Sequence, residues 1–188
     1  MIINNYDRVK IKPVCTINTK ETLKEIKELV PVLENYKWCI TAGTCLGLYR
    51  DNCLIPHDTD FDIEIYNSNQ KEIKKLNSIL LTLGLKNCRT MIDKKNRYSQ
   101  LAYYLSNGFI FDIYFYYDED KDYYINYNDI GILKMPKKFI EHTYIKDKLR
   151  YPQKIEEYLK YRFGKDWKIP TKKKQGWGSD AGEALQRK

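Results

Sequence analysis

The chain has 188 residues, 43% of them hydrophobic and 31% charged, which is enough for one domain with a real core. No apolar run reaches the roughly 18 residues that a membrane span needs, and no signal peptide is visible at the N-terminus. Five cysteines without a C-x-x-C pair argue against a zinc knuckle or a disulfide framework, and indicate reduced thiols in a cytoplasmic compartment.

The net charge of +8 is unevenly distributed. Residues 134–188 hold 16 Lys and Arg against 7 Asp and Glu, whereas residues 1–133 are nearly neutral. Such a basic segment suits a phosphate-bearing or otherwise anionic partner, although a solubilising surface would have the same composition.

The predicted elements alternate between helices and strands before a run of antiparallel strands. Apolar residues at helical spacing predict helices over 19–33, 71–83 and 152–163. Pro31 is expected to kink or end the first of them. Strands are expected over 38–41, 61–66, 98–105 and 109–116, with a weaker pair over 123–127 and 130–135. Asn107-Gly108 predicts a hairpin turn, and 43–50 a tight turn that enters a short helix.

This order predicts an α+β or α/β fold, a mixed sheet with helices packed on it. Residues 1–170 are expected to form a single domain. After Pro170 the hydrophobic periodicity stops, so residues 171–188 are expected to form a basic, disordered tail.

The densest chemical signal is the run Asp58-Thr59-Asp60-Phe61-Asp62. Alternate residues of an extended segment face the same side, so Asp60 and Asp62 project together. Two carboxylates this close raise each other's pKa unless a cation neutralises them. Oxygen ligands suit Mg²⁺ or Mn²⁺, which also take up substrate phosphates. The alternative is a solvated acidic turn.

Asp112 is the second signal, because it lies in the almost wholly apolar segment 109–115. A carboxylate in such a strand is costly unless it is paired or metal-bound. Asp112 is therefore the natural third ligand if its strand lies beside that of Asp60 and Asp62. Alternatively, it faces water at a strand edge.

The third signal is the turn around Gly43 and Thr44, which follows a strand and opens a helix. Glycine lets the backbone approach a phosphate, and helix N–H groups and the Thr44 hydroxyl can bind it. Arg50 could face the same phosphate or simply lie on the surface. His57 could stack or hydrogen-bond at the site, although a lone histidine is more often structural.

A glycine–hydroxyl turn, then Asp-x-Asp on one strand and a single Asp on a later strand, resembles the nucleotidyltransferase fold of the polymerase β type. The stretch AGTCLGLYRDNCLIPHDTDFDI is similar to the signature of the LicD/fukutin family, G-T-L-L-G-x-x-R followed by I-P-W-D-x-D-x-D. Residues 161–167 with Pro170 resemble that family's Y-G-x-D-W-x-x-P element. Two departures are His57 in place of Trp and Cys45 in place of Leu.

The resemblance implies transfer of a phospho-substituent, such as phosphocholine or ribitol phosphate, from a CDP-linked donor to a glycan hydroxyl. It implies Mg²⁺ or Mn²⁺ at the carboxylates, with Asp112 as the candidate general base. The assigned metal ligands are Asp60, Asp62 and Asp112, with Asp58 as a further ligand or a support. The assigned substrate-binding residues are Gly43, Thr44, Arg50, His57 and Lys165.

Two other functions stay open. A small nucleotidyltransferase that adds a nucleotide from an NTP to a small molecule, protein or RNA would use the same carboxylates. A basic nucleic-acid-binding module would instead use Lys172–Lys174 and exposed tyrosines, and is the least favoured.

Overall fold

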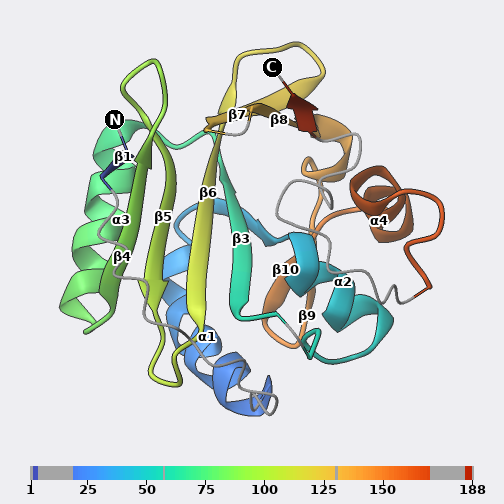
Figure 1. Cartoon of the computed structure of the whole chain (residues 1–188), viewed down its shortest axis with the longest axis horizontal. Helices are drawn as coiled ribbons and strands as arrows, with labels where there is room; N and C mark the ends of the chain where they lie inside the picture. The colour runs from blue at the N-terminus through green and yellow to red at the C-terminus, as the bar shows by residue number, and fades with distance from the viewer. Residues whose placement is uncertain (1, 4–18, 57, 130, 170–184, 188) are drawn as a thin grey trace.

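The central element is a mixed nine-stranded sheet, seen in a computed structural model of the chain (Figure 1). The structure describes residues 2–3, 19–56, 58–129, 131–169 and 185–187. The sheet strands are β1 Ile2–Ile3, β2 Lys37–Ile40, β3 Asp60–Tyr66, β4 Lys86–Ile92, β5 Tyr98–Tyr104, β6 Ile110–Asp118, β7 Tyr123–Asn128, β8 Gly131–Pro136 and β11 Leu185–Arg187. The order β1-β4-β5-β6-β7-β8-β11 is antiparallel, and β3 branches from it by pairing in parallel with β6 and antiparallel with β2.

The remaining elements are helices and a small second sheet. The helices are α1 Thr19–Leu33, α2 Ala42–Arg50, α3 Gln70–Thr82, α4 Ile155–Phe163 and a 3-10 turn at Lys137–Phe139. Strands β9 Tyr144–Lys146 and β10 Leu149–Tyr151 form an antiparallel hairpin. The predicted α+β fold, a mixed sheet with helices packed on it, is confirmed.

Local sequence signals explain most of these elements. Asn69 caps α3 in a capping box with Glu72, which satisfies backbone N–H groups of the first turn. Pro31 lies inside α1, which continues to Leu33 rather than ending at the proline. The Asn107-Gly108 turn joins β5 to β6 as predicted, and Gly108 takes the left-handed φ of +84° that glycine adopts without strain.

The two faces of the sheet differ in chemistry. One face carries Phe61, Phe111 and Tyr103 in a single cross-strand row. These side chains are fully buried in the core, and the Tyr103 hydroxyl donates to Asn77 of α3. Helices α1 and α3 lie on this face (Figure 1). The opposite face is therefore the one that carries the carboxylates of β3 and β6.

The tail is described only in part. Residues 170–184 lie outside the described residues, whereas Leu185–Arg187 form β11 and pair with β8. The predicted division at residue 170 stays a prediction.

Two further expectations concern membranes and thiols. None of the described helices is both long and apolar enough to cross a bilayer. Among the described residues, the thiols of Cys39, Cys45, Cys53 and Cys88 are free, and Cys15 lies outside them.

Candidate active site

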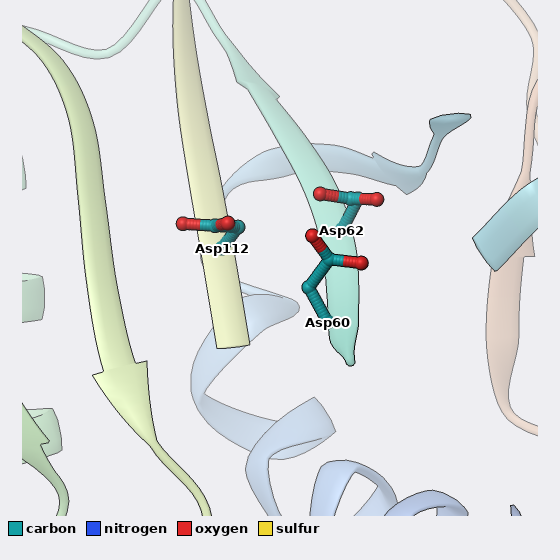
Figure 2. A group of neighbouring side chains, drawn as sticks. All are labelled: Asp60, Asp62 and Asp112. Atoms are coloured by element: carbon teal, nitrogen blue, oxygen red, sulfur yellow. The ribbon is translucent and has the colours of Figure 1, made fainter. Parts of the chain in front are cut away.

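Three aspartates converge on neighbouring parallel strands. Asp62 on β3 lies directly opposite Asp112 on β6, and Asp60 stands two residues earlier on the same face of β3. One carboxylate oxygen from each lies within 4.8 Å of the others. Figure 2 shows the three side chains projecting from the same side of the two strands. The condition for Asp112 to join the site, that its strand lies beside that of Asp60 and Asp62, is met.

The acidic triad, as we call Asp60, Asp62 and Asp112, is electrostatically unfavourable without a cation. Burial, followed by the charges of Asp112 and Asp58, raises the pKa of Asp60 to about 7. Burial and the charges of Asp60 and Asp112 raise the pKa of Asp62 well above its ordinary value. Three carboxylate oxygens converging in a buried position fit a hard divalent cation, which would remove this repulsion. The triad could therefore bind a metal.

The first turn of α2 packs against the acidic run. A β-carbon on Gly43 would lie 2.3 Å from Oδ2 of Asp58, so only glycine leaves room for that carboxylate. The buried Thr44 hydroxyl accepts a hydrogen bond of 2.8 Å from the backbone N–H of Asp62. Gly43 thus lies beside Asp58, and Thr44 lies beside Asp62 of the triad and holds the β3 backbone in place.

Helix α4 and the segment after it, which includes the residues that resemble the family's C-terminal motif, support this turn. The hydroxyls of Tyr158 on α4 and Thr41 share a buried hydrogen bond of 2.5 Å. The backbone N–H of Thr41 in turn donates to the carbonyl oxygen of Asp62. Trp167 packs its ring on Tyr49 of α2 at a centroid distance of 5.9 Å. The two motifs, more than a hundred residues apart in sequence, are therefore joined in space.

The other predicted substrate-binding residues show no contact with the triad where the structure describes them. Arg50 donates from Nε and Nη2 to both carboxylate oxygens of Asp51, at 2.8 and 2.7 Å, and from Nη1 to the carbonyl oxygen of Trp167. Lys165 is exposed in the turn after α4. His57 lies outside the described residues, as do Lys172–Lys174. Their roles stay predictions.

Sequence reasoning missed two polar neighbours of the triad. Nη2 of Arg89 donates to both oxygens of Asp112 at 2.9 Å, and Nε2 of Gln100 donates to Oδ1 at 2.7 Å. The contact of Gln100 could have been predicted from the sequence, because the Asn107-Gly108 turn sets the register that brings β5 beside Asp112. Arg89 lies on β4, whose sequence KNCRTMI carries no alternation and was not recognised as a strand.

A buried ion pair beneath the triad was also missed. Glu64, two residues after Asp62 on the same strand face, lies 3.6 Å from Nη1 of Arg162 and accepts a hydrogen bond from the Tyr66 hydroxyl. Arg162 is buried, and its charge opposes the rise in the pKa of Asp62. The signal was the polar side of the β3 alternation, where Glu64 continues the series of Asp60 and Asp62.

Comparisons with known proteins relate this chain to one family. A model of the LicD/FKTN/FKRP nucleotidyltransferase domain matches residues 35–150. Ribitol-5-phosphate transferase FKTN of Macaca fascicularis is 27% identical over 165 residues, covering 81% of this chain and 34% of that protein. The human protein is 26% identical over 165 residues, with the same shares of both chains. The mouse protein is 29% identical over 139 residues, covering 71% of this chain and 30% of that protein. The chain spans about a third of the length of these curated relatives.

Among solved structures, the lincomycin-bound lincosamide antibiotic adenylyltransferase LnuA matches with a TM-score of 0.48 and 14% identity, covering 69% of this chain and 77% of that one. The family model spans more than half of the chain and includes the glycine turn and all three aspartates. The chain belongs to the LicD/FKTN/FKRP family and matches it in the nucleotidyltransferase domain.

Proposed function

We propose that this chain is a metal-dependent phosphotransferase. It moves a phospho-substituent, such as ribitol phosphate or phosphocholine, from a CDP-linked donor to the hydroxyl of a glycan. The observation that carries the proposal is the acidic triad on two parallel strands of a family nucleotidyltransferase domain. The FKTN relatives are named as ribitol-5-phosphate transferases, which supports the choice of transferred group.

The triad would hold Mg²⁺ or Mn²⁺, and Asp58 would support it from beside Gly43. The bound metal would neutralise the donor diphosphate and the charge that develops on the leaving phosphate. Asp60 and Asp62 are fixed relative to each other by their strand, and Thr44 and Thr41 hold the backbone of Asp62 from both sides. This rigid placement is what a phosphoryl-transfer site needs, since positioning supplies much of the rate.

In the proposed reaction the acceptor oxygen attacks the β-phosphorus of the donor. A new P–O bond forms, and the bond from that phosphorus to the bridging oxygen breaks. CMP leaves with the electron pair of the broken bond. Asp112 is the candidate general base for the proton of the acceptor hydroxyl. It would have to accept that proton while it also serves as a metal ligand. The N–H groups of the α2 turn at Gly43 and Thr44 would bind the donor phosphate.

Ligand-induced thermal stabilisation tests the proposal. A ligand at a hundred times its Kd adds about 2.7 kcal/mol to the stability of the native state. For a chain of this size the melting temperature rises by roughly 5–10 °C. CDP-linked alcohols should produce this shift with Mg²⁺ or Mn²⁺ and lose it with EDTA or in Asp62→Asn. Asp51→Asn, an acidic residue paired with Arg50 instead, is the matched control.

The same assay separates the alternatives. A clear preference for ATP over every CDP compound would favour the nucleotidyltransferase that adds a nucleotide from an NTP, and a shift that needs no metal would contradict both enzymes. Salt-dependent nucleic-acid binding that survives Asp62→Asn would favour the basic binding module. A cytoplasmic location stays a prediction from the cysteine pattern.

A further inference from the structure

Arg89 belongs to the same cross-strand row as the acidic triad. Arg89 on β4 lies opposite Ala102 on β5, Ala102 lies opposite Asp112 on β6, and Asp112 lies opposite Asp62 on β3. Residues paired in this way share one face of a sheet. Ala102 has the only short side chain of the row, so the arginine can extend over it and reach Asp112 on the strand beyond.

A register shift in β4 places Arg89 on this face. Asn87 pairs with Tyr103 and Arg89 pairs with Ala102, so Cys88 is an extra residue in β4. Without the shift, Cys88 would lie opposite Ala102 and Arg89 would point to the apolar face. Bulges of this kind commonly redirect a side chain next to an active site. The shift therefore brings a cation to three carboxylates.

The guanidinium of Arg89 uses only one of its nitrogens. Nη2 binds both oxygens of Asp112. Within the described part of the chain, Nε is buried without a hydrogen-bond acceptor, and Nη1 makes no hydrogen bond. The side chain keeps 25% of its surface exposed, whereas that of Asp112 keeps 2%. Nη1 therefore remains as a donor for a ligand that approaches the triad from solvent.

Two other arginines of the described chain, Arg50 and Arg162, are paired with other groups. Arg50 is bonded to Asp51 and to the carbonyl of Trp167, and Arg162 is buried against Glu64. The positive charge of Arg89 also lowers the pKa of Asp60 against the effect of burial, so its field reaches the second strand of the triad. Guanidinium groups bind phosphate oxygens with several donors at once.

We propose that Arg89 is a further phosphate-binding residue of this site: it balances the charge of Asp112 when no metal is bound, and it binds a phosphate of the nucleotide donor when a divalent cation takes over Asp112. The proposal rests on the proposed function, because it needs a metal at the triad and a phosphate-bearing donor. It gives Arg89 the phosphate contact that the sequence suggested for Arg50.

Binding of two probes to the full chain tests this proposal. Mn²⁺ is titrated into the metal-free protein by calorimetry, and CDP and ATP are then titrated in the presence of Mn²⁺. In Arg89→Gln we expect several-fold tighter Mn²⁺ binding, since no guanidinium competes for Asp112. We expect at least about tenfold weaker nucleotide binding, because a charge-assisted hydrogen bond is lost. If Arg89 had a purely structural role, Arg89→Gln would weaken the binding of both Mn²⁺ and nucleotide.

Arg89→Lys separates charge from geometry. Lysine keeps the positive charge but lacks the several fixed donors of a planar guanidinium. The Mn²⁺ affinity should therefore stay within a few-fold of wild type, while nucleotide binding still weakens. Arg97→Gln is the matched control, because Arg97 pairs with Asp93 and Glu119 instead, and both affinities should stay unchanged. If Arg89→Gln does not fold, nucleotide binding by Arg89→Lys decides alone.

The outcomes distinguish the two proposals. Wild type that binds Mn²⁺ and nucleotide, together with Arg89 variants whose two affinities fall in parallel or do not change, would overturn the role of Arg89 and leave the proposed function standing. Wild type that binds neither probe would overturn both. A preference for CDP or for ATP identifies the donor class without affecting the role of Arg89, since both carry the phosphate.

Discussion

Asp60→Asn should stabilise the metal-free protein at high pH while abolishing transfer. The pKa of Asp60 is raised from 3.8 to about 7 by burial and by the neighbouring carboxylates. Between these two values the native chain holds a proton that the unfolded chain has lost. The stability of the metal-free protein therefore decreases as the pH rises from about 4 to about 7. Asparagine is neutral at every pH and avoids this loss.

The size of the effect follows from the same two values. A raised pKa of about three units, at about 1.4 kcal/mol for each unit, amounts to about 4 kcal/mol above pH 7. The charges of Asp60 and Asp112 also raise the pKa of Asp62, so this value belongs to the cluster and is an upper bound for one substitution. The expected gain for Asp60→Asn in EDTA is thus about 1–4 kcal/mol at pH 8 and near zero at pH 4.

Urea unfolding followed by circular dichroism measures this difference. Wild type and variant are compared at pH 4 and pH 8 in EDTA, and again at pH 8 with Mg²⁺. Saturating Mg²⁺ should stabilise wild type more than the variant, because the variant has lost a ligand. Asp51→Asn is the control of opposite sign, since the hydrogen bond and charge of Arg50 lower the pKa of Asp51. That substitution should bring no gain at pH 8.

An Asp60→Asn variant that is no more stable than wild type at pH 8 in EDTA would refute the reasoning. It would mean that the carboxylates are neutralised within the protein itself, and the main physical reason for a metal at the triad would disappear. Transfer activity close to that of wild type would be equally damaging, because the site would then function without one of its three oxygen ligands.

Four further substitutions and one truncation test the surroundings of the site. Gly43→Ala should fold but lose donor binding, since the added carbon displaces the carboxylate of Asp58. In Gly47→Ala the added carbon would lie 2.7 and 2.9 Å from backbone atoms, so the free energy of unfolding, measured by thermal unfolding, should fall by about 1–3 kcal/mol. Thr44→Val should cost about 1–3 kcal/mol by leaving the buried N–H of Asp62 unpaired, and Thr44→Ser should largely restore stability. Truncation after Pro170 should leave the cooperative unfolding transition intact; loss of that transition would show that the tail belongs to the domain.

Local patterns in the sequence determined most of the elements and the core of the site. The apolar spacing of 19–33 and 71–83 predicted α1 and α3 within a residue or two. The alternation over 61–66 predicted β3 and the shared face of Asp60 and Asp62. These succeed because helix and strand periodicity depends on neighbours a few residues apart, which the sequence displays directly.

The role of Asp112 could be predicted only in part from the sequence. Its cost in an apolar strand indicated that a partner was needed, and the identity of that partner depended on which strand lay beside it. The structure places β6 parallel to β3, so that Asp112 meets Asp62 in register. Parallel pairing joins segments about fifty residues apart, and nothing in either segment alone specifies it.

The cations of the site were decided by tertiary structure alone. Arg50 stands within the family-like signature, yet its guanidinium pairs with Asp51 and Trp167 because the C-terminal motif packs against α2. Arg89 stands in a strand without alternation, yet a one-residue register shift aims it at Asp112. A long flexible side chain such as arginine pairs with an opposite charge that the fold holds in place. Strand pairing and helix packing set the positions of those charges, and no local pattern encodes them.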